Sequence, residues 1–335
     1  MYLFNIKSAK IKRGTSPRRN LMKKIILLIL CVALSLTALV SCGSSDIQDS
    51  TTGLAYTVVT NGNVRSLAVY VYDASKLSAN VEIPATYGNY TVTEIKAEAF
   101  RGLDTVKSVK LSKNINKIGA FAFYDCSMLA DISVDEENET YSSKDGSLYS
   151  KTGKKLIQYA PGKSDTAFNV PGDVEVINPY AVSGAIRLES VTLNSNVKTI
   201  GLGAFENCTK LKSINIPDSV ETIDTSAFRE CEKLESITLG ANVKVIGQHA
   251  FLGCTSLATV ELGTKLNEIK SYAFDGCKAL TEIKLRSTVT TVGTAAFRGC
   301  TAINVYVEEA TRPNGWSSSW GEGLNDTQIH FSALG

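Results

Sequence analysis

The sequence contains few of the residues on which most catalytic and metal sites depend. Its 335 residues include only two histidines, two tryptophans, three methionines and seven prolines. The histidines, His249 and His330, lie in no H-E-x-x-H motif, and the chain has neither a G-x-S-x-G motif nor a phosphate-binding glycine loop. Its cysteines form no C-x-x-C pair, a spacing common among zinc ligands. We therefore expect no enzyme activity and no metal or other cofactor.

The chain also lacks the excess of basic residues that a nucleic-acid-binding protein carries. Its 35 Lys and Arg balance 33 Asp and Glu, for a formal net charge of +2. Eight basic residues and no acidic residue precede Cys42, so residues 42–335 hold 27 basic and 33 acidic residues, a net charge of −6. This balance disfavours nucleic acid and anionic lipid as direct partners. The low proline count and the 44% of hydrophobic residues exclude long-range disorder.

The basic residues at the N-terminus belong to an export signal. Met22-Lys23-Lys24 opens an apolar run from Ile25 to Val40 that only Ser35 and Thr37 interrupt. Sixteen residues are fewer than the ~20 that a membrane-spanning helix needs, so residues 1–41 are predicted to be a signal peptide rather than a permanent anchor. Because the signal is complete from Met22 onward, Met22 is the expected start and residues 1–21 an upstream extension of the reading frame.

The end of the apolar run resembles a bacterial lipobox. Leu39-Val40-Ser41-Cys42 has the form in which the signal is cut before a cysteine that then carries acyl chains. The resemblance implies that Cys42 is the lipid attachment residue and the only membrane contact. An ordinary cysteine beside an ordinary cleavage site is the alternative. The polar stretch that follows makes residues 42–53 a predicted tether.

A 23-residue repeat organises the rest of the chain. Five phenylalanines recur at this interval, each preceded by Ala and followed three residues later by Cys. They are Phe205, Phe228, Phe251, Phe274 and Phe297. Phe100 and Phe123 keep the interval, and Val182 fills the same position, so eight turns of the repeat, here called rungs, are visible. One rung reads L-x-x-I-x-L-x-x-x-V-x-x-I-x-x-x-A-F-x-x-C-x-x.

This pattern predicts one turn of a coil. The I-x-L stretch alternates as a short strand does, with one face toward the interior. The Val-x-x-Ile spacing returns apolar groups to the core, and Ala-Phe-x-x-Cys has the spacing of one helical or 3-10 turn. A single rung buries too few side chains to offset the entropy of ordering it, so its stability must come from parallel stacking on its neighbours.

The repeat resembles the leucine-rich repeat, specifically the BspA-like class of bacterial surface proteins, which shares the period and the I-x-x-x-A-F-x-x-C corner. The resemblance covers residues 56–335 and implies a solenoid of short parallel strands joined by short helical or 3-10 turns. The asparagine ladder of ordinary leucine-rich repeats is missing after the strand, where Ile216-Pro217-Asp218-Ser219 stands instead.

The ends and one internal segment depart from the repeat. Residues 54–90 are predicted to form an N-terminal β cap, residues 91–305 the solenoid, and residues 306–335 a C-terminal cap. A hairpin insertion is expected at about residues 135–170, because the interval from Phe123 to Val182 exceeds one period by 36 residues. Trp316 and Trp320 are expected to cover the last strand, and a ligand platform is the alternative for this pair.

Two other groups of residues are interpreted as structural. The six repeat cysteines alternate with Leu103 and Ala185 in the same column, which favours free buried thiols over disulfides between adjacent rungs. The acidic run from Asp135 to Glu139 has no EF-hand spacing, which favours a solvated loop over a calcium site.

The outward-facing strand positions are the candidate ligand surface. They would present a long row of fixed side chains to an extended partner, although Ser and Thr there are equally compatible with solvent. These positions are Ser108, Lys110, Asp131, Ser190, Thr192, Ser213, Asn215, Ser236, Thr238, Thr259, Glu261, Glu282 and Lys284.

The function expected is that of a non-enzymatic binding module. The signal, Cys42 and the resemblance together imply an exported, membrane-anchored lipoprotein at the cell surface that binds an extracellular protein of a host or neighbouring cell. The alternatives are a lipoprotein that captures glycan or peptide, and a structural spacer without a ligand.

Overall fold

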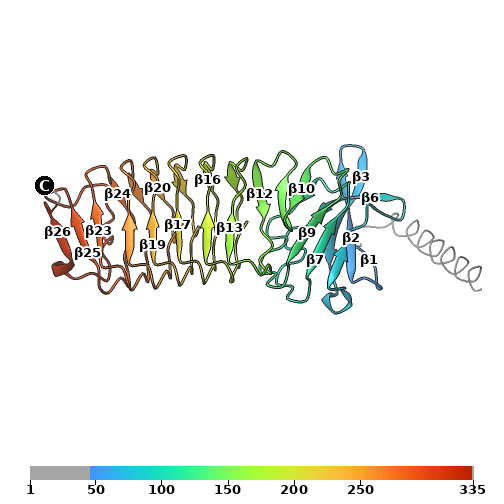
Figure 1. Ribbon diagram of the computed structural model, residues 1–335, viewed down its shortest axis with the longest axis horizontal. Coiled ribbons are helices and arrows are strands. Elements are labelled where there is room, and N and C mark those ends of the chain that lie inside the picture. Colours follow the sequence, from blue (N-terminus) through green and yellow to red (C-terminus); the bar gives the residue numbers. More distant parts are fainter. Residues whose placement is uncertain (1–45, 334–335) are drawn as a thin grey trace, which may run out of the picture.

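The computed structural model describes residues 46–333, which form an elongated coil whose turns stack along one axis (Figure 1). The predicted signal peptide and Cys42 lie outside the described residues. Each regular rung contributes two strands. A strand of three or four residues lies on one side of the coil, and a two-residue strand joins a second sheet on another side. The predicted solenoid of short parallel strands is therefore confirmed.

The side of the molecule that carries the longer strands is here called the strand face. Its strands run parallel, and equivalent residues of successive rungs pair in register, as Val191 with Ile214 and Ile214 with Ile237. In the three-residue strands of the regular rungs, the central residue points into the core and its two neighbours point out. The strands are β4 (Asn80–Glu82), β7 (Ser108–Leu111), β9 (Asp131–Val134), β13 (Ala167–Asn169), β15 (Ser190–Thr192), β17 (Ser213–Asn215), β19 (Ser236–Thr238), β21 (Thr259–Glu261), β23 (Glu282–Leu285), β25 (Asn304–Val307) and β26 (Ile329–Phe331).

The second sheet, here called the back sheet, consists of the short strands at the Val-x-x-Ile segment and continues into the insertion. Ile200, Ile223 and Ile246 pair in register along it and are fully buried. Its strands are β10 (Tyr141–Lys144), β11 (Ser147–Ser150), β12 (Lys155–Gln158), β14 (Val176–Ile177), β16 (Thr199–Ile200), β18 (Thr222–Ile223), β20 (Val245–Ile246), β22 (Glu268–Ile269) and β24 (Thr291–Val292).

An N-terminal β cap closes the first rung, and its central hairpin pairs Leu54–Asn61 with Val64–Val71 as predicted. The cap begins earlier than expected. Ile47 is buried against this hairpin and Asp46 accepts a hydrogen bond from Thr57, so the prediction of a free tether is wrong for residues 46–53. The cap strands are β1 (Ile47–Gln48), β2 (Leu54–Asn61), β3 (Val64–Val71), β5 (Thr86–Tyr87), β6 (Tyr90–Ile95) and β8 (Lys117–Ile118).

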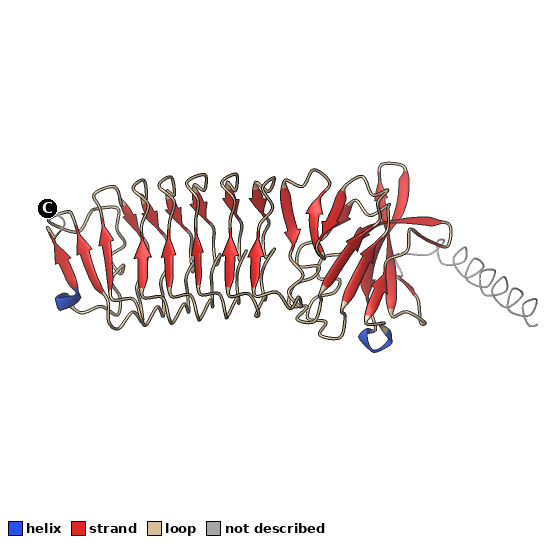
Figure 2. Ribbon diagram, in the orientation of Figure 1, coloured by secondary structure: helices blue, strands red, loops and turns tan. Residues whose placement is uncertain are grey.

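The corner that carries the phenylalanine is a chain of β-turns rather than a helical turn. The residue two positions before the phenylalanine adopts a left-handed conformation, as at His249, where φ is 56°. A second left-handed residue stands two positions after the phenylalanine, as at Gly253. These two residues break any helix and aim the backbone N–H groups at the next rung. The 3-10 helices of the described residues, Ala74–Lys76 and Asp326–Gln328, lie at opposite ends of the molecule (Figure 2).

Three backbone hydrogen bonds join each regular corner to the next rung. In the Phe205 rung they run from Gly203 N to Thr225 O, from Phe205 N to Ala227 O and from Asn207 N to Arg229 O, at 2.8–2.9 Å. The phenylalanine rings stack along the axis with centroids 5.1–5.6 Å apart from Phe205 to Phe297. Backbone and core therefore impose the same spacing on successive rungs.

The insertion forms where predicted, and a buried asparagine starts it. β10 and β11 make an antiparallel hairpin around Asp145 and Gly146. Asn138 stands where regular rungs carry Val220 or Val243, and its side chain is fully buried. Its amide nitrogen donates to Ser112 O and Ile115 O, and its oxygen accepts from the backbone N–H groups of Thr140 and Tyr141, all at 2.8–3.0 Å. The Asn138 side chain thus holds the start of the hairpin and, at the same time, the turn of the preceding rung.

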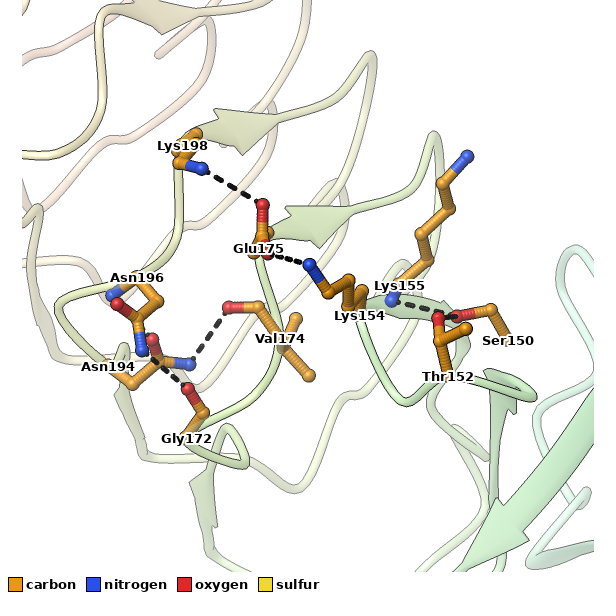
Figure 3. A network of polar contacts seen from close by, with 10 residues as sticks. All are labelled: Ser150, Thr152, Lys154, Lys155, Gly172, Val174, Glu175, Asn194, Asn196 and Lys198. Carbon is orange, nitrogen blue, oxygen red and sulfur yellow. Dashed lines mark hydrogen bonds and ion pairs between the residues drawn. The ribbon is translucent and has the colours of Figure 1, made fainter.

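A polar network on the surface ties the insertion to the regular rungs (Figure 3). Glu175 accepts from Lys154 at 2.7 Å and from Lys198 at 2.9 Å, so one carboxylate bridges three consecutive rungs. Asn194 and Asn196 extend the network by donating to Val174 O and Gly172 O. The two lysines hold the pKa of Glu175 down at about 2.

Replacing Asn138 by the valine of regular rungs is expected to destabilise the protein although it restores the repeat pattern. The change leaves the carbonyl of Ile115 and the N–H groups of Thr140 and Tyr141 without partners and removes one of the two donors to Ser112 O, which costs about 2–4 kcal/mol. Denaturant unfolding of Asn138→Val measures this loss. Asn116→Val, at an exposed asparagine, is the control and should change stability by less than about 0.5 kcal/mol. Equal stability of the two variants would contradict the structural role of Asn138.

The Glu175 network gives the stability a defined acid dependence. The pKa of Glu175 is lowered from 4.5 to about 2 in the folded state, so its contribution is complete above pH 4.5 and disappears as the pH falls toward 2. The melting temperature of Glu175→Gln should be lower than that of the unmodified protein at pH 7, and the two should converge near pH 2. A difference that stayed constant across this range would show that the lysines do not act on this carboxylate.

Candidate functional site

The residues predicted to form the ligand surface lie on the strand face. These residues flank inward positions of β7, β9, β15, β17, β19, β21 and β23 that are buried except for the half-buried Val260, and all of them are exposed except the half-buried Ser108. In the regular rungs they lie in two in-register columns. The first contains Ser190, Ser213, Ser236 and Thr259, and the second contains Thr192, Asn215, Thr238 and Glu261.

Charged side chains on this surface pair mainly with their own neighbours. Lys110 contacts Glu82 at 3.0 Å, and Lys284 contacts Glu282 at 3.2 Å. Glu261 accepts from Thr238 at 3.3 Å. Because these pairs are exposed, each adds little to stability and remains available to a partner.

The strand face is interrupted between β21 and β23. Within the described residues the hydrogen-bonded ladder that begins at β13 ends at β21, and a new one begins at β23. A shallow groove of about 340 Å³ occupies this break. Four of the predicted residues line it, together with one cation that the sequence did not single out. They are Thr259, Glu261, Glu282, Lys284 and Arg286.

Two aromatic side chains extend the strand face beyond the predicted positions. Tyr306 pairs with Lys284 and His330 pairs with Tyr306, so both continue an outward column. Their rings stack with centroids 4.9 Å apart, and His330 Nε2 lies 3.1 Å from Asn304 Oδ1. Counting by 23 misses Tyr306 because this step takes 22 residues. The alternation of Asn304-Val-Tyr-Val307 is the signal that locates it.

Trp316 and Trp320 belong to the C-terminal cap, as their first interpretation predicts. They are 4% and 5% exposed, and the Trp320 ring meets Phe297 edge to face. Trp316 Nε1 donates to Val289 O at 3.0 Å. Both rings are covered by protein, so the alternative of a ligand platform has no exposed ring face to use.

The six cysteines of the described residues are free and buried, as predicted. Within the column, each thiol points to a backbone carbonyl of the preceding rung, as Cys231 Sγ does to Phe205 O at 3.1 Å and Cys254 Sγ to Phe228 O at 3.1 Å. Burial raises the pKa of Cys126 to about 12 and also raises those of Cys231, Cys254 and Cys277. The column is thus unreactive packing rather than a redox or metal site.

His249 stands at a left-handed corner position and stacks on Tyr272, with ring centroids 5.3 Å apart. Desolvation and the nearby Arg229 lower the pKa of the imidazole. Its contacts are those of a surface residue at the corner.

The stacked rungs and the two sheets define a parallel β-solenoid built from leucine-rich repeats. The chain belongs to the family described as BspA type Leucine rich repeat region, which it matches in six copies over residues 56–154 and 167–304. The family resemblance seen in the sequence is thereby confirmed. No curated protein matches the chain.

Solved structures of bacterial leucine-rich repeat proteins are similar to this chain. One from Bacteroides ovatus is 22% identical, with a TM-score of 0.52, and the alignment covers 84% of this chain and 70% of that one. A leucine rich cell surface protein from Faecalibacterium prausnitzii is 19% identical, with a TM-score of 0.45 and coverages of 85% and 98%. The pneumococcal vaccine antigen PcpA is 18% identical, with a TM-score of 0.44 and coverages of 86% and 97%. At this identity, the likeness to the Bacteroides protein shows a shared fold.

Between residues 46 and 333, no helix is long and apolar enough to cross a membrane.

The state of the cysteine column can be checked by alkylation. The folded protein should leave these six thiols unmodified, because they are buried and their pKa values are raised. In denaturant without reductant all six should react, as read by mass spectrometry of the protein's peptides. Thiols that stayed blocked in denaturant would reveal disulfides and overturn the assignment.

Proposed function

We propose that this protein is an exported, lipid-anchored surface protein that binds another protein through its strand face and catalyses no reaction. The observation that carries the proposal is the combination of a long exposed polar surface with a groove at the break between β21 and β23. A solenoid fixes the spacing of its outward side chains before a partner arrives, so little entropy is lost on binding.

The position of the N-terminal cap supports an anchored arrangement. The first described residue, Asp46, comes four residues after Cys42, a span of at most about 14 Å of extended chain. Acyl chains on Cys42 would therefore hold the cap close to the membrane. The groove lies toward the other end of the elongated molecule, where a partner on a second surface would meet it (Figure 1).

The groove chemistry favours a protein partner. Glu261, Glu282, Lys284 and Arg286 place two acidic and two basic groups around it. Mixed charges of this kind match the mixed rim of a protein surface better than the uniform charge of nucleic acid. An extracellular protein of a host or neighbouring cell is the proposed partner.

A second candidate is capture of a glycan at the end of the strand face. The stacked pair of Tyr306 and His330 is half-buried and gives an outward column an aromatic end. Sugar rings pack on partly exposed aromatic rings. The candidate glycan site is therefore this pair rather than the buried tryptophans. A spacer without a ligand would use neither surface.

Substitutions on the strand face test the leading proposal. After screening against extracellular proteins and glycans, the double variant Glu261→Ala/Lys284→Ala should bind the partner at least about tenfold more weakly, because it removes charges on both sides of the groove. The matched control, Glu221→Ala/Lys244→Ala, removes an exposed ion pair outside the strand face and should bind as the unmodified protein does. Loss confined to Tyr306→Ala would indicate the glycan site, and equal binding by all variants would contradict both.

The anchor is tested separately. Cys42→Ala should abolish incorporation of labelled fatty acid and release the protein from the membrane fraction. Retention with undiminished label would contradict attachment at this residue.

A further inference from the structure

One corner of the solenoid is two residues shorter than the others. In the regular Phe205 rung, four residues separate Ile200 of the back sheet from the phenylalanine. In the insertion rung, Leu156 pairs with Ile177, and Tyr159 N donates to Ala181 O at 2.6 Å, the bond that Phe205 N makes to Ala227 O. Tyr159 therefore occupies the phenylalanine position with only Ile157 and Gln158 before it. This corner also falls within residues 155–166, which the family match omits.

The short corner leaves a pocket between its two neighbours. The pocket has a volume of about 360 Å³, at the lower end of the range of small-ligand sites, and its lining is mostly apolar. Ile118 and Phe121 come from the preceding corner, Tyr180 and Leu202 from the next two, and Ile157 from the short corner itself. Gln158 is held in place because its Nε2 donates to Tyr159 O at 2.9 Å.

Two backbone N–H groups in the pocket lining, those of Phe121 and Phe123, have no backbone or side-chain acceptor within residues 46–333, and neither has the exposed N–H of Asp125. In regular rungs the N–H groups of the phenylalanine and of both left-handed residues donate to the next rung. Among the described residues, the equivalent N–H groups of Phe121, Phe123 and Asp125 make no such bond. Phe123 is 2% exposed, so a partner for its N–H has to come from the pocket or from water.

Aromatic side chains of the rungs before and after the short corner contact one another. Phe121 and Tyr180 occupy equivalent positions two rungs apart, a separation of about 9.6 Å in a regular stack, yet their ring centroids are 4.7 Å apart. Tyr124 meets Tyr180 edge to face at 5.3 Å. Since these rings already touch one another, a flat sugar or base has no space between them.

We propose that this pocket, here called the corner pocket, binds a short peptide segment of a partner protein. The peptide takes the place of the two missing corner residues: its carbonyl groups accept from the N–H groups of Phe121 and Phe123, and one aliphatic side chain enters the apolar pocket. The molecule itself shows the complement, because a regular rung has the four residues Gly201-Leu202-Gly203-Ala204 where the short corner has only Ile157 and Gln158. The site does not use the strand face, so it stands or falls independently of the function proposed above.

The probe is the acetylated and amidated tetrapeptide Gly-Leu-Gly-Ala, which copies residues 201–204. Full-length protein labelled with ¹⁵N should bind it saturably with a Kd below about 1 mM, with the largest shifts at the amides of Phe121 and Phe123. The same peptide with Asp in place of Leu should bind at least about tenfold more weakly, because the pocket is apolar.

Two variants close the corner pocket in different ways. Insertion of Gly-Ala between Gln158 and Tyr159 restores the regular corner and should abolish peptide binding. Ala120→Trp fills the pocket from its exposed edge and should do the same without changing chain length. Gln248→Trp places the same side chain at the equivalent position of a regular corner and should bind normally.

The results separate this proposal from the strand-face function. Peptide binding that survives Glu261→Ala/Lys284→Ala but is lost in Ala120→Trp supports the corner pocket. No saturable binding by the unmodified protein, or equal binding by Ala120→Trp and Gln248→Trp, overturns it. If the insertion variant fails to fold, the tryptophan pair still decides.

Discussion

Each rung of this protein depends on the next rung to complete its hydrogen bonds. A two- or three-residue strand has no partner within its own turn of chain, so its backbone groups are satisfied only across the stack. The same holds for the corner, where left-handed residues such as His249 and Gly253 direct N–H groups at the following turn. This requirement explains the constant period, the in-register columns, and the caps at both ends.

Where that stacking is interrupted, the molecule gains surfaces that a perfect repeat would not have. The ladder breaks between β21 and β23, and charged strand-face residues surround the resulting groove. The short corner at Ile157 and Gln158 leaves donors of the preceding rung unpaired beside an apolar pocket. Both features place unsatisfied or exposed groups next to fixed neighbours, which is the condition for recognising a partner without large rearrangement.

The buried columns were predictable because a repeated sequence reports its own spacing. Phe228, Cys231 and Ile237 lie in the core as the pattern requires, and the Asp145-Gly146 turn forms the expected hairpin. The prediction of a helical turn at the corner was wrong, because periodicity shows that a segment turns but does not show its backbone conformation. Gly, Asn or Asp two residues after most of the phenylalanines was the available sign of a left-handed position. Residues 46–53 were assigned to the tether because a polar stretch does not reveal that Ile47 finds a place against a neighbouring hairpin.

The sequence by itself determined the class of fold, the rung length, the buried thiols and the strand positions that face outward. These follow from local alternation and from one period, and each rung repeats the evidence. The tertiary structure decided where register fails: the 22-residue step that brings Tyr306 into an outward column, the break at β21, and the two residues missing before Tyr159. Such features depend on the contacts between rungs. A change of one or two residues in the length of a rung alters the structure only through the rungs that stack on either side of it.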